Sequence, residues 1–164
     1  MITFRNAVGF LETIAKEHTI IKSFHSGFMD EVDINKLGVE DYVILYAEPG
    51  TATVDKGALT YTFTLYVLDM INDQIVGDAP NNERLGRLDT LSENLQILQD
   101  VINEFHQNLY STSWVDDEVI LDLPISCEPF TARFDNLLTG WSATISMQVN
   151  NKNNLCIVPV NPNS

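Results

Sequence analysis

The sequence predicts an α+β fold in which two helices pack on one face of a mostly antiparallel sheet. Two segments repeat apolar residues at the three- and four-residue spacing of a helix. Several others alternate apolar and polar residues, as strands with one buried face do. Along the chain the order is helix, strands, helix, strands, with connections of the hairpin type. This order is typical of an α+β sandwich and differs from the βαβ alternation that builds parallel sheets.

The first predicted helix covers residues 4–18, and Thr3 is its candidate N-cap. The helix carries one apolar stripe, formed by Phe4, Val8, Leu11 and Ile14. The segment that follows, TIIKSFHSGFM, is rich in β-branched and aromatic residues but contains Gly27. A glycine inside a strand weakens it, so we expect this segment at the edge of the sheet.

A hairpin is predicted next. The run YVILYA is apolar on both faces, as expected of a strand covered on both sides, and the run ALTYTFTLYVLDMI alternates apolar residues with threonines. The connection between them, TATVDKG, is long for a hairpin turn and has Asp55, Lys56 and Gly57 at its tip. We therefore expect an arm near residues 50–59 that projects beyond the sheet.

The second helix is predicted from residue 83 to residue 109 and has the strongest periodicity in the chain. Thr90 and Glu93 match a capping box, which would place its start later. The stripe could also be a coiled-coil seam between subunits, but Ile97 and Val101 widen it into a band that favours burial against the sheet. Its apolar positions step by three and four residues: Leu88, Leu91, Leu95, Leu98, Ile102, Phe105 and Leu109.

The rest of the chain predicts strands and loops. VILDLPISCEPF places alternate apolar residues on one face, and Pro124 favours an edge strand or a bulge. The stretch from Thr139 to Val149 alternates regularly, and we expect its apolar side to meet the long helix. NNKNN then turns the chain into LCIVPV, a short last strand that contains Pro159. We expect residues 1–164 to form a single domain.

The composition argues against two classes of partner. The chain carries 23 acidic and 9 basic residues, a formal net charge of -14, and its lysines and arginines are scattered. Nucleic acids and anionic lipids are bound through clustered basic residues, so we expect neither specific nucleic-acid binding nor membrane binding. The N-terminus lacks the pattern of a signal peptide, and no apolar run approaches the roughly 20 residues of a membrane-spanning helix. We therefore expect a soluble protein.

No motif in the sequence points to a reaction. Nucleophile elbows, phosphate-binding glycine loops and dinucleotide fingerprints are absent. His18, His25 and His106 form no metal-binding pair, and the acidic clusters lack the spacing of an EF-hand loop. Cys127 and Cys156 lie in apolar segments, where reduced buried thiols are favoured over a disulfide. We predict that the protein is not an enzyme and has no catalytic residues, metal site or cofactor.

Three phrases are distinctive when taken together: TYTFTLYVLDMINDQ, NERLGRLDTLSENLQILQDVINEF, and PFTARFDNLLTGWSATISMQV followed by NNLCIVP. They resemble small virion proteins of tailed bacteriophages of Bacteroidetes-type hosts, including crAss-like phages. The order of helices and hairpins is also similar to that of phage tail-terminator and neck (head-tail connector) ring proteins. The resemblance covers most of the chain from Tyr42 to Pro159 and implies a tail-terminator-like domain.

This resemblance implies a structural virion protein of the tail or neck, assembled in the host cytoplasm, that terminates or connects the tail. It implies a closed ring of about six or twelve copies that contacts neighbouring tail-tube, portal or connector proteins and uses no cofactor. Such rings use strand edges and an extended loop, which correspond here to residues 51–57 and 130–140. Because the chain is acidic, we expect DNA to pass through the lumen without specific binding. The expected interface residues are Asp55, Lys56, Arg84, Phe130 and Arg133.

Other functions remain open from the sequence. A small-ligand-binding module or small enzyme would hold an apolar cleft between sheet and helices, lined by Tyr61, Tyr66, His106 and Trp141. A monomeric scaffold protein that joins other virion proteins would need neither a cleft nor a ring. The oligomeric state of the purified protein separates a ring from these alternatives.

Overall fold

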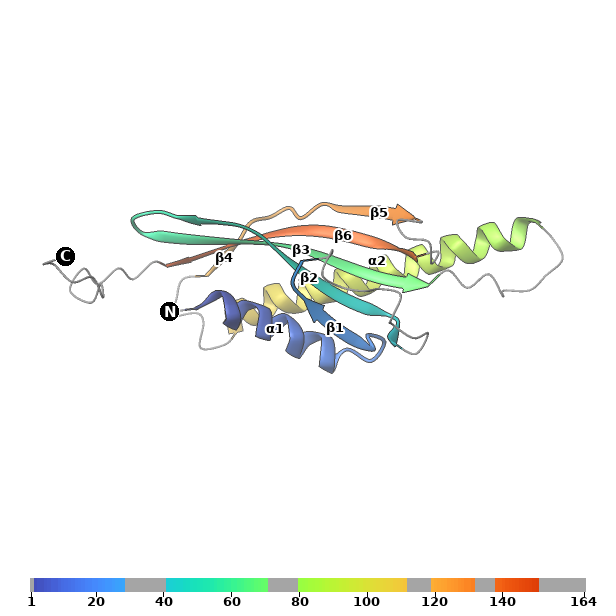
Figure 1. Cartoon of the computed structure of the whole chain (residues 1–164), viewed down its shortest axis with the longest axis horizontal. Coiled ribbons are helices and arrows are strands. Elements are labelled where there is room, and N and C mark those ends of the chain that lie inside the picture. Colours follow the sequence, from blue (N-terminus) through green and yellow to red (C-terminus); the bar gives the residue numbers. More distant parts are fainter. Residues whose placement is uncertain (1, 29–40, 71–79, 112–118, 132–137, 151–164) are drawn as a thin grey trace, which may run out of the picture.

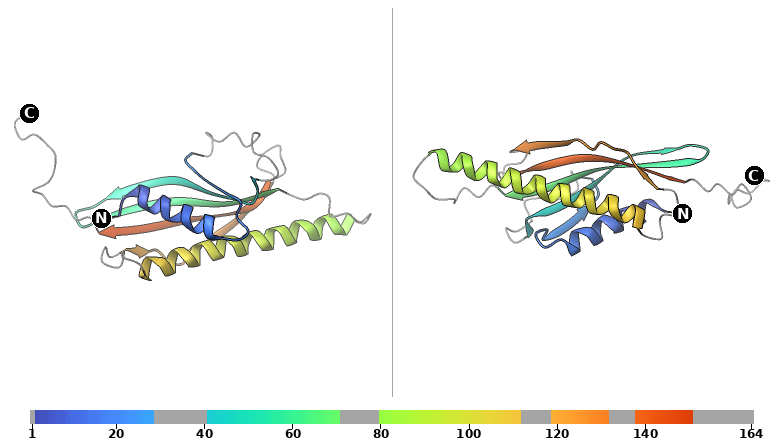
Figure 2. Two further views of the ribbon diagram at one scale, coloured as in Figure 1. Left: turned by 90° about the horizontal axis from the view of Figure 1, so that it is seen from below. Right: turned by 180° about the vertical axis from the view of Figure 1, so that it is seen from behind.

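The computed structural model describes residues 2–28, 41–70, 80–111, 119–131 and 138–150. Within these residues two helices and six strands follow one another as α1, β1, β2, β3, α2, β4, β5 and β6. All six strands belong to one sheet, and both helices lie on the same face of it (Figures 1 and 2). The predicted α+β class, with two helices on one face, is therefore confirmed.

Helix α1 (Phe4–Glu17) begins where the sequence predicts. The Thr3 side-chain oxygen accepts a hydrogen bond of 3.2 Å from the Asn6 backbone N–H, and the Asn6 side-chain oxygen accepts one of 3.0 Å from the Thr3 N–H. This reciprocal capping box satisfies backbone donors that the first helical turn leaves without partners. The buried face of the helix then consists of Ala7, Leu11, Ile14 and Ala15.

The sheet is mostly antiparallel, as predicted, but it is mixed, because one of its strand pairings is parallel. Its order is β1 (Ser23–Ser26), β2 (Ile44–Val54), β3 (Ala58–Met70) and β6 (Leu138–Asn150). Two short strands, β4 (Ile120–Leu121) and β5 (Cys127–Thr131), pair with different parts of β6 at the far edge. The pairs within β2, β3, β6, β4 and β5 are antiparallel, but β1 is parallel to β2. Residues 27–43 separate β1 from β2, and a connection of this length permits the parallel return that a tight turn forbids.

The main core lies between the sheet and the helices. Strand alternation turns the odd-numbered residues of β3 and β6 toward the helices, and cross-strand pairing places them side by side. The long helix α2 (Pro80–Ser111) covers them with Ile97, Leu98, Val101 and Phe105. The expectation that the apolar side of 139–149 meets this helix is confirmed. The buried sheet residues include Phe63, Leu65, Val67, Ala143, Ile145 and Met147.

Strand β2 is buried on both sides at its start. Leu45 and Ala47 face the helices, whereas Ile44 and Tyr46 join Leu68 in a smaller cluster on the opposite face. The apolar run YVILYA therefore has the two-sided burial that its composition predicts.

Two predicted boundaries are wrong, and one predicted stripe is buried only in part. Helix α2 starts at Pro80, ahead of both residue 83 and the capping box at Thr90, since proline is tolerated in a first turn whose N–H groups have no helical partner. The stripe is not buried throughout, because Leu88 is 53% exposed where α2 extends past the sheet (Figure 1). The predicted strand 119–130 is divided into β4 and β5 around Pro124, which has no N–H to donate, and Leu123 is exposed. The predicted last strand, LCIVPV, and the side chain of Leu109 at the end of the stripe lie outside the described residues.

Candidate assembly surface

The β2–β3 hairpin extends beyond the helices as a paired ribbon (Figure 1). Its strands pair up to Val54 and Leu59, and the Asp55 N–H donates a hydrogen bond of 2.8 Å to the Ala58 carbonyl oxygen across the turn. TATVDKG is therefore the end of a strand followed by a short turn, and the long loop predicted from it is wrong. We call residues 50–59 the arm; residues 50–57 are all exposed.

A register shift determines which way the arm side chains face. Pro49 pairs with Phe63, but Ala52 pairs with Tyr61, so the strand contains an irregularity between them. Gly50 lies in it, and a side-chain carbon added there would sit 3.0 Å from the Thr62 carbonyl oxygen. Because of the shift, Ala52 and Val54 lie on the face that carries the main core. Neither described helix covers that face at the arm, and Val54 is 73% exposed.

An apolar groove opens at the base of the arm, between the start of α1 and the end of β1. Its volume is about 240 Å³, and we call it the α1 groove. The Phe4 ring stacks on the Phe63 ring in its floor, with ring centroids 5.0 Å apart. Arg5 lies at its rim, exposed, and makes no ion pair with any described residue. The groove is lined by Phe4, Arg5, Val8, Ser26, Gly27, Ala47, Pro49 and Phe63.

The two edges of the sheet differ. β1 stops opposite Ala47, so no described strand pairs with the outer edge of β2 from Glu48 to Val54. Pro49 and the register shift interrupt that edge, which limits indiscriminate strand addition. The other edge is made of the two short strands β4 and β5, and Pro129 lies within β5. The outer edge of β2 is therefore the longer edge with backbone groups available to another chain.

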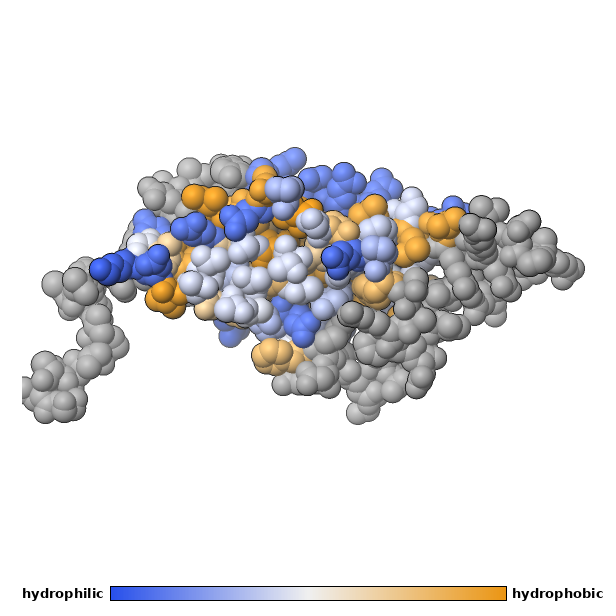
Figure 3. Space-filling view, turned by 90° about the horizontal axis from the view of Figure 1, so that it is seen from above, coloured by the Kyte–Doolittle hydropathy of each residue, from blue (hydrophilic) through white to orange (hydrophobic). Residues whose placement is uncertain are grey.

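The face of the sheet opposite the helices carries an uncharged polar patch, visible as a pale area in Figure 3. Thr62 pairs with Ser146, and Thr64 with Thr144. At one end of this patch the Tyr66 ring meets those of Tyr46 and Phe130 edge-on, with centroids 6.4 and 6.1 Å away. The Tyr66 hydroxyl donates a hydrogen bond of 3.1 Å to the Glu48 carboxylate. These contacts hold Tyr66 and Phe130 in fixed positions on this face.

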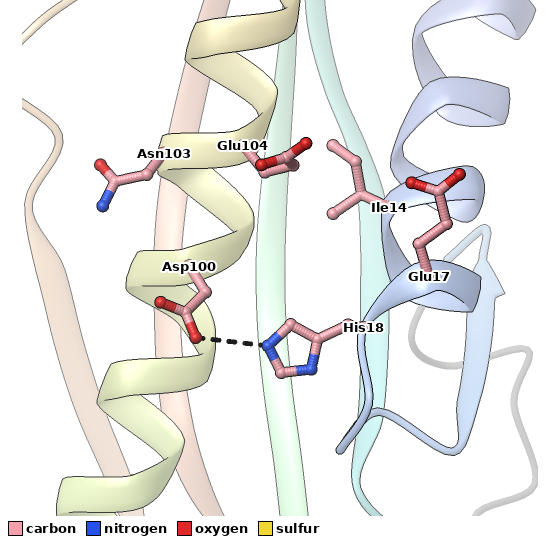
Figure 4. Close-up of a pocket in the computed structure, with 6 residues that line it drawn as sticks. All are labelled: Ile14, Glu17, His18, Asp100, Asn103 and Glu104. Carbon is pink, nitrogen blue, oxygen red and sulfur yellow. Dashed lines mark hydrogen bonds and ion pairs between the residues drawn. The ribbon is translucent and has the colours of Figure 1, made fainter.

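A pocket of about 430 Å³ lies between α1 and α2 (Figure 4). In its wall His18 Nε2 lies 3.3 Å from an Asp100 carboxylate oxygen. His18 Nδ1 accepts a hydrogen bond from the Ile20 N–H, which requires the ring proton to be on Nε2, so a neutral histidine donates to Asp100. Glu17 and Glu104 add two further carboxylates. The described residues that line the pocket include no hydroxyl, thiol or amine.

Metal and thiol chemistry have little support in the part of the chain that the structure describes. No group of three or more His, Cys, Asp or Glu side chains in it is placed to hold a metal ion. Cys127 is a free thiol, and burial raises its pKa, which disfavours the reactive thiolate. Cys156 lies outside the described residues. No described helix is long and apolar enough to cross a membrane.

The structure separates the residues predicted for the interface. Asp55 and Lys56 lie at the arm tip, whereas Phe130 pairs with Gly140 near the other end of the sheet. Along β3 these ends correspond to Ala58 and Leu68, and ten residues at roughly 3.3 Å each put them about 33 Å apart. Arg84 lies in the first turns of α2 with its side chain outside the description, and Arg133 is also outside the described residues. Asp55 and Lys56 therefore do not share one compact patch with Phe130.

The cleft predicted from Tyr61, Tyr66, His106 and Trp141 does not form. Tyr61 and Trp141 face the helices, but Tyr66 is on the opposite face of the sheet. The Tyr61 hydroxyl donates to the Ile2 carbonyl oxygen at 3.3 Å, and the Trp141 indole donates to the Leu91 carbonyl oxygen at 2.8 Å. Residues on two faces of one sheet cannot line a common cleft.

Sequence reasoning missed the α1 groove and the exposed apolar side of the arm. No local motif marks the groove, since its residues come from four separate segments. The one hint of the exposed apolar side in the sequence was Val54, an apolar residue directly before the polar turn. No family model matches the chain, and no curated protein is significantly similar to it.

Proposed function

We propose that the chain is a structural virion protein that forms a closed ring at the head-tail or neck junction of a tailed phage, where it terminates or connects the tail. In this proposal the domain is tail-terminator-like, carries no catalytic site and uses no cofactor. Its neighbours are tail-tube, portal or connector proteins. The sequence phrases that resemble phage virion proteins motivate this choice.

One observation supports ring formation most strongly: the arm projects past the helices and exposes Val54 on its apolar side. A projecting ribbon with a strand edge that no described strand pairs, and with an apolar side chain on one side, can add to a surface of another chain. The same subunit offers different surfaces at the groove and along the outer edge of β2. Two unlike patches on each subunit permit a head-to-tail contact, which closes into a ring if the rotation between copies allows it.

The charge of the chain supports the path we propose for DNA. A formal net charge of -14 leaves few cations for phosphate contacts, so DNA would move through an acidic lumen with little adhesion. An assembled ring with a positively charged lumen would contradict this part of the proposal, whatever the total charge.

Light scattering during size-exclusion chromatography tests the proposed function. We expect the full chain to elute as a discrete assembly of about six or twelve copies, or to reach that size as the protein concentration rises. Gold-labelled antibodies against the chain should bind purified phage particles where head and tail meet. A monomer at every concentration, together with labelling elsewhere on the particle or none, would leave the monomeric alternatives instead.

A further inference from the structure

The arm and the α1 groove complement each other in shape and polarity. Near its tip the arm carries the exposed Val54, followed by the exposed Asp55 and Lys56. The Asp55 carboxylate accepts a hydrogen bond of 2.7 Å from the Lys56 backbone N–H. The groove is an apolar hollow with an exposed cation, Arg5, at its rim. We infer that the arm of one copy docks in the α1 groove of the next copy, with Val54 inserted between Phe4 and Pro49 and Asp55 paired with Arg5. This inference rests on the proposed ring and assigns its contact.

Among the described residues, nothing covers the apolar surfaces on the two sides. Val54 and Ala52 continue the core face of the sheet past the end of the helices. On the groove side, Phe4 is 38% exposed although it stacks on the buried Phe63. Burying apolar surface that faces water is the main favourable contribution to association. We therefore expect contact between these two surfaces to stabilise the assembly.

The arm cannot fill the groove of its own chain. Its two strands pair up to Val54 and Leu59, and the turn is closed by the hydrogen bond from Asp55 to Ala58. Figure 1 shows this paired ribbon extending beyond the helices. From Pro49 in the groove to Val54 near the tip, five residues at roughly 3.3 Å each give a reach of about 16 Å. An arm that fills the groove must therefore come from another copy of the chain.

Charge favours a second copy of this chain at this position. Two copies that each carry -14 repel each other over most of their surfaces. The α1 groove is apolar and has a cation at its rim, so it is a surface where an incoming acidic residue is attracted. Among the described cations, Lys16 is paired with Glu12 at 2.9 Å, whereas Arg5 has no ion-pair partner in the described residues. Asp55, directly after Val54, supplies the opposite charge.

Cross-linking between single-cysteine variants tests the contact. Cys127 and Cys156 are first replaced by alanine, and then Val54→Cys and Ser26→Cys are made on separate chains. Ser26 is exposed at the groove. The two proteins are mixed, allowed to exchange subunits and treated with a short bismaleimide. We expect a cross-linked pair in the mixture and little in either protein alone, because docking brings unlike surfaces together. A matched variant, Thr13→Cys on the exposed side of α1, should not cross-link to Val54→Cys.

Charge reversal tests the proposed pair. Arg5→Glu should raise the protein concentration needed for half-assembly by about threefold or more. The variant loses the weak attraction of an exposed ion pair and gains a repulsion between the introduced carboxylate and Asp55 of the next copy. Adding Asp55→Lys in the same chain should restore assembly. Lys22→Glu makes the same charge change at an exposed site outside the groove and should have the smaller effect. Val54→Asp should raise the half-assembly concentration by about tenfold or more, since it places a charge in an apolar groove.

The outcomes separate this inference from the proposed function. If the wild-type chain assembles but Val54→Cys and Ser26→Cys do not cross-link, the ring stands and the contact assigned here is wrong. If the wild-type chain stays monomeric at all concentrations, both are wrong. If Arg5→Glu is rescued by Asp55→Lys and the mixed cysteine variants cross-link, the contact is supported.

Discussion

The indole N–H of Trp141 on β6 donates a hydrogen bond of 2.8 Å to the backbone carbonyl oxygen of Leu91 in α2. This bond ties the long helix to the central part of the sheet at a half-buried position. Below it along the helix, Leu98, Val101 and Phe105 are fully buried. The bond therefore lies near the point from which α2 packs against the sheet.

Trp141→Phe should lower the free energy of unfolding by about 1–3 kcal/mol, because it removes the hydrogen bond and part of the packed ring. Urea denaturation followed by circular dichroism measures the change. Tyr42→Phe is a useful comparison, since it removes a hydroxyl from a half-buried ring in the smaller cluster. If Trp141→Phe is as stable as the wild type, the bond does not hold the helix.

Gly140→Ala should destabilise the fold by about 1–3 kcal/mol, the usual range for overpacking a core. A methyl group at this buried glycine would overlap the Val67 carbonyl oxygen and would lie 3.0 Å from the Phe130 ring. Gly9→Ala is the matched control, because nothing lies within 4 Å of its added carbon and it is inside α1. That control should stabilise the protein by about 0.5–1 kcal/mol. Thermal unfolding of both variants checks the pair, and equal melting temperatures would contradict it.

Asn94→Leu should stabilise the protein by about 1–3 kcal/mol. Asn94 is fully buried in α2, and neither its side-chain nitrogen nor its oxygen has a hydrogen-bond partner in the described part of the structure. A buried amide without partners carries its desolvation cost without compensation, and a leucine, which branches at the same carbon with the same number of heavy atoms, avoids it. Asn103→Leu, at an exposed position of the same helix, should change stability by less than about 0.5 kcal/mol. A clear loss of stability in Asn94→Leu would show that the amide has a partner in the folded protein.

Asp69 should make the protein less stable as the pH rises. Burial raises the pKa of its carboxyl group above the ordinary 3.8; the Met70 N–H acts in the opposite direction, and nearby Glu93 raises the pKa further. Because the folded state binds this proton more tightly than the unfolded state, the contribution to stability is present below pH 3.8 and is lost as the pH rises through the folded value. Asp69→Asn should therefore be more stable than the wild type at pH 7.

Urea denaturation at several pH values measures this effect. Glu128→Gln, which removes one exposed carboxylate from β5, serves as the control for total charge. Asp69→Asn should flatten the slope of unfolding free energy against pH above pH 4 more than Glu128→Gln does. The same slope in both variants would mean that Asp69 titrates alike in the folded and unfolded chain.

Features set by neighbouring residues could be predicted from the sequence. Thr3 caps α1 as expected, because a cap depends on residues within one turn. The alternation from Thr139 to Val149 correctly indicated the face that meets α2, since strand geometry sets it. In both cases the signal and the structure lie in the same short segment.

Features that depend on pairing between distant segments could not be predicted. The parallel pairing of Ser23 with Ile44 and the register shift after Pro49 have no local sequence signature. In the candidate site, the exposed position of Asp55 and Lys56 could be predicted from the turn residues. The side of the sheet on which Val54 lies could not, because the register shift moves it to the face that carries the main core. Arg5 was missed because the groove it borders forms when α1 packs beside β1 and β2.

Electron microscopy of the purified full chain tests most directly the claim that each copy uses two unlike surfaces to form a closed assembly. We predict class averages that show closed rings with rotational symmetry of about six or twelve copies and a central opening. Single unassembled particles, open filaments, or dimers with twofold symmetry as the sole product would contradict the account.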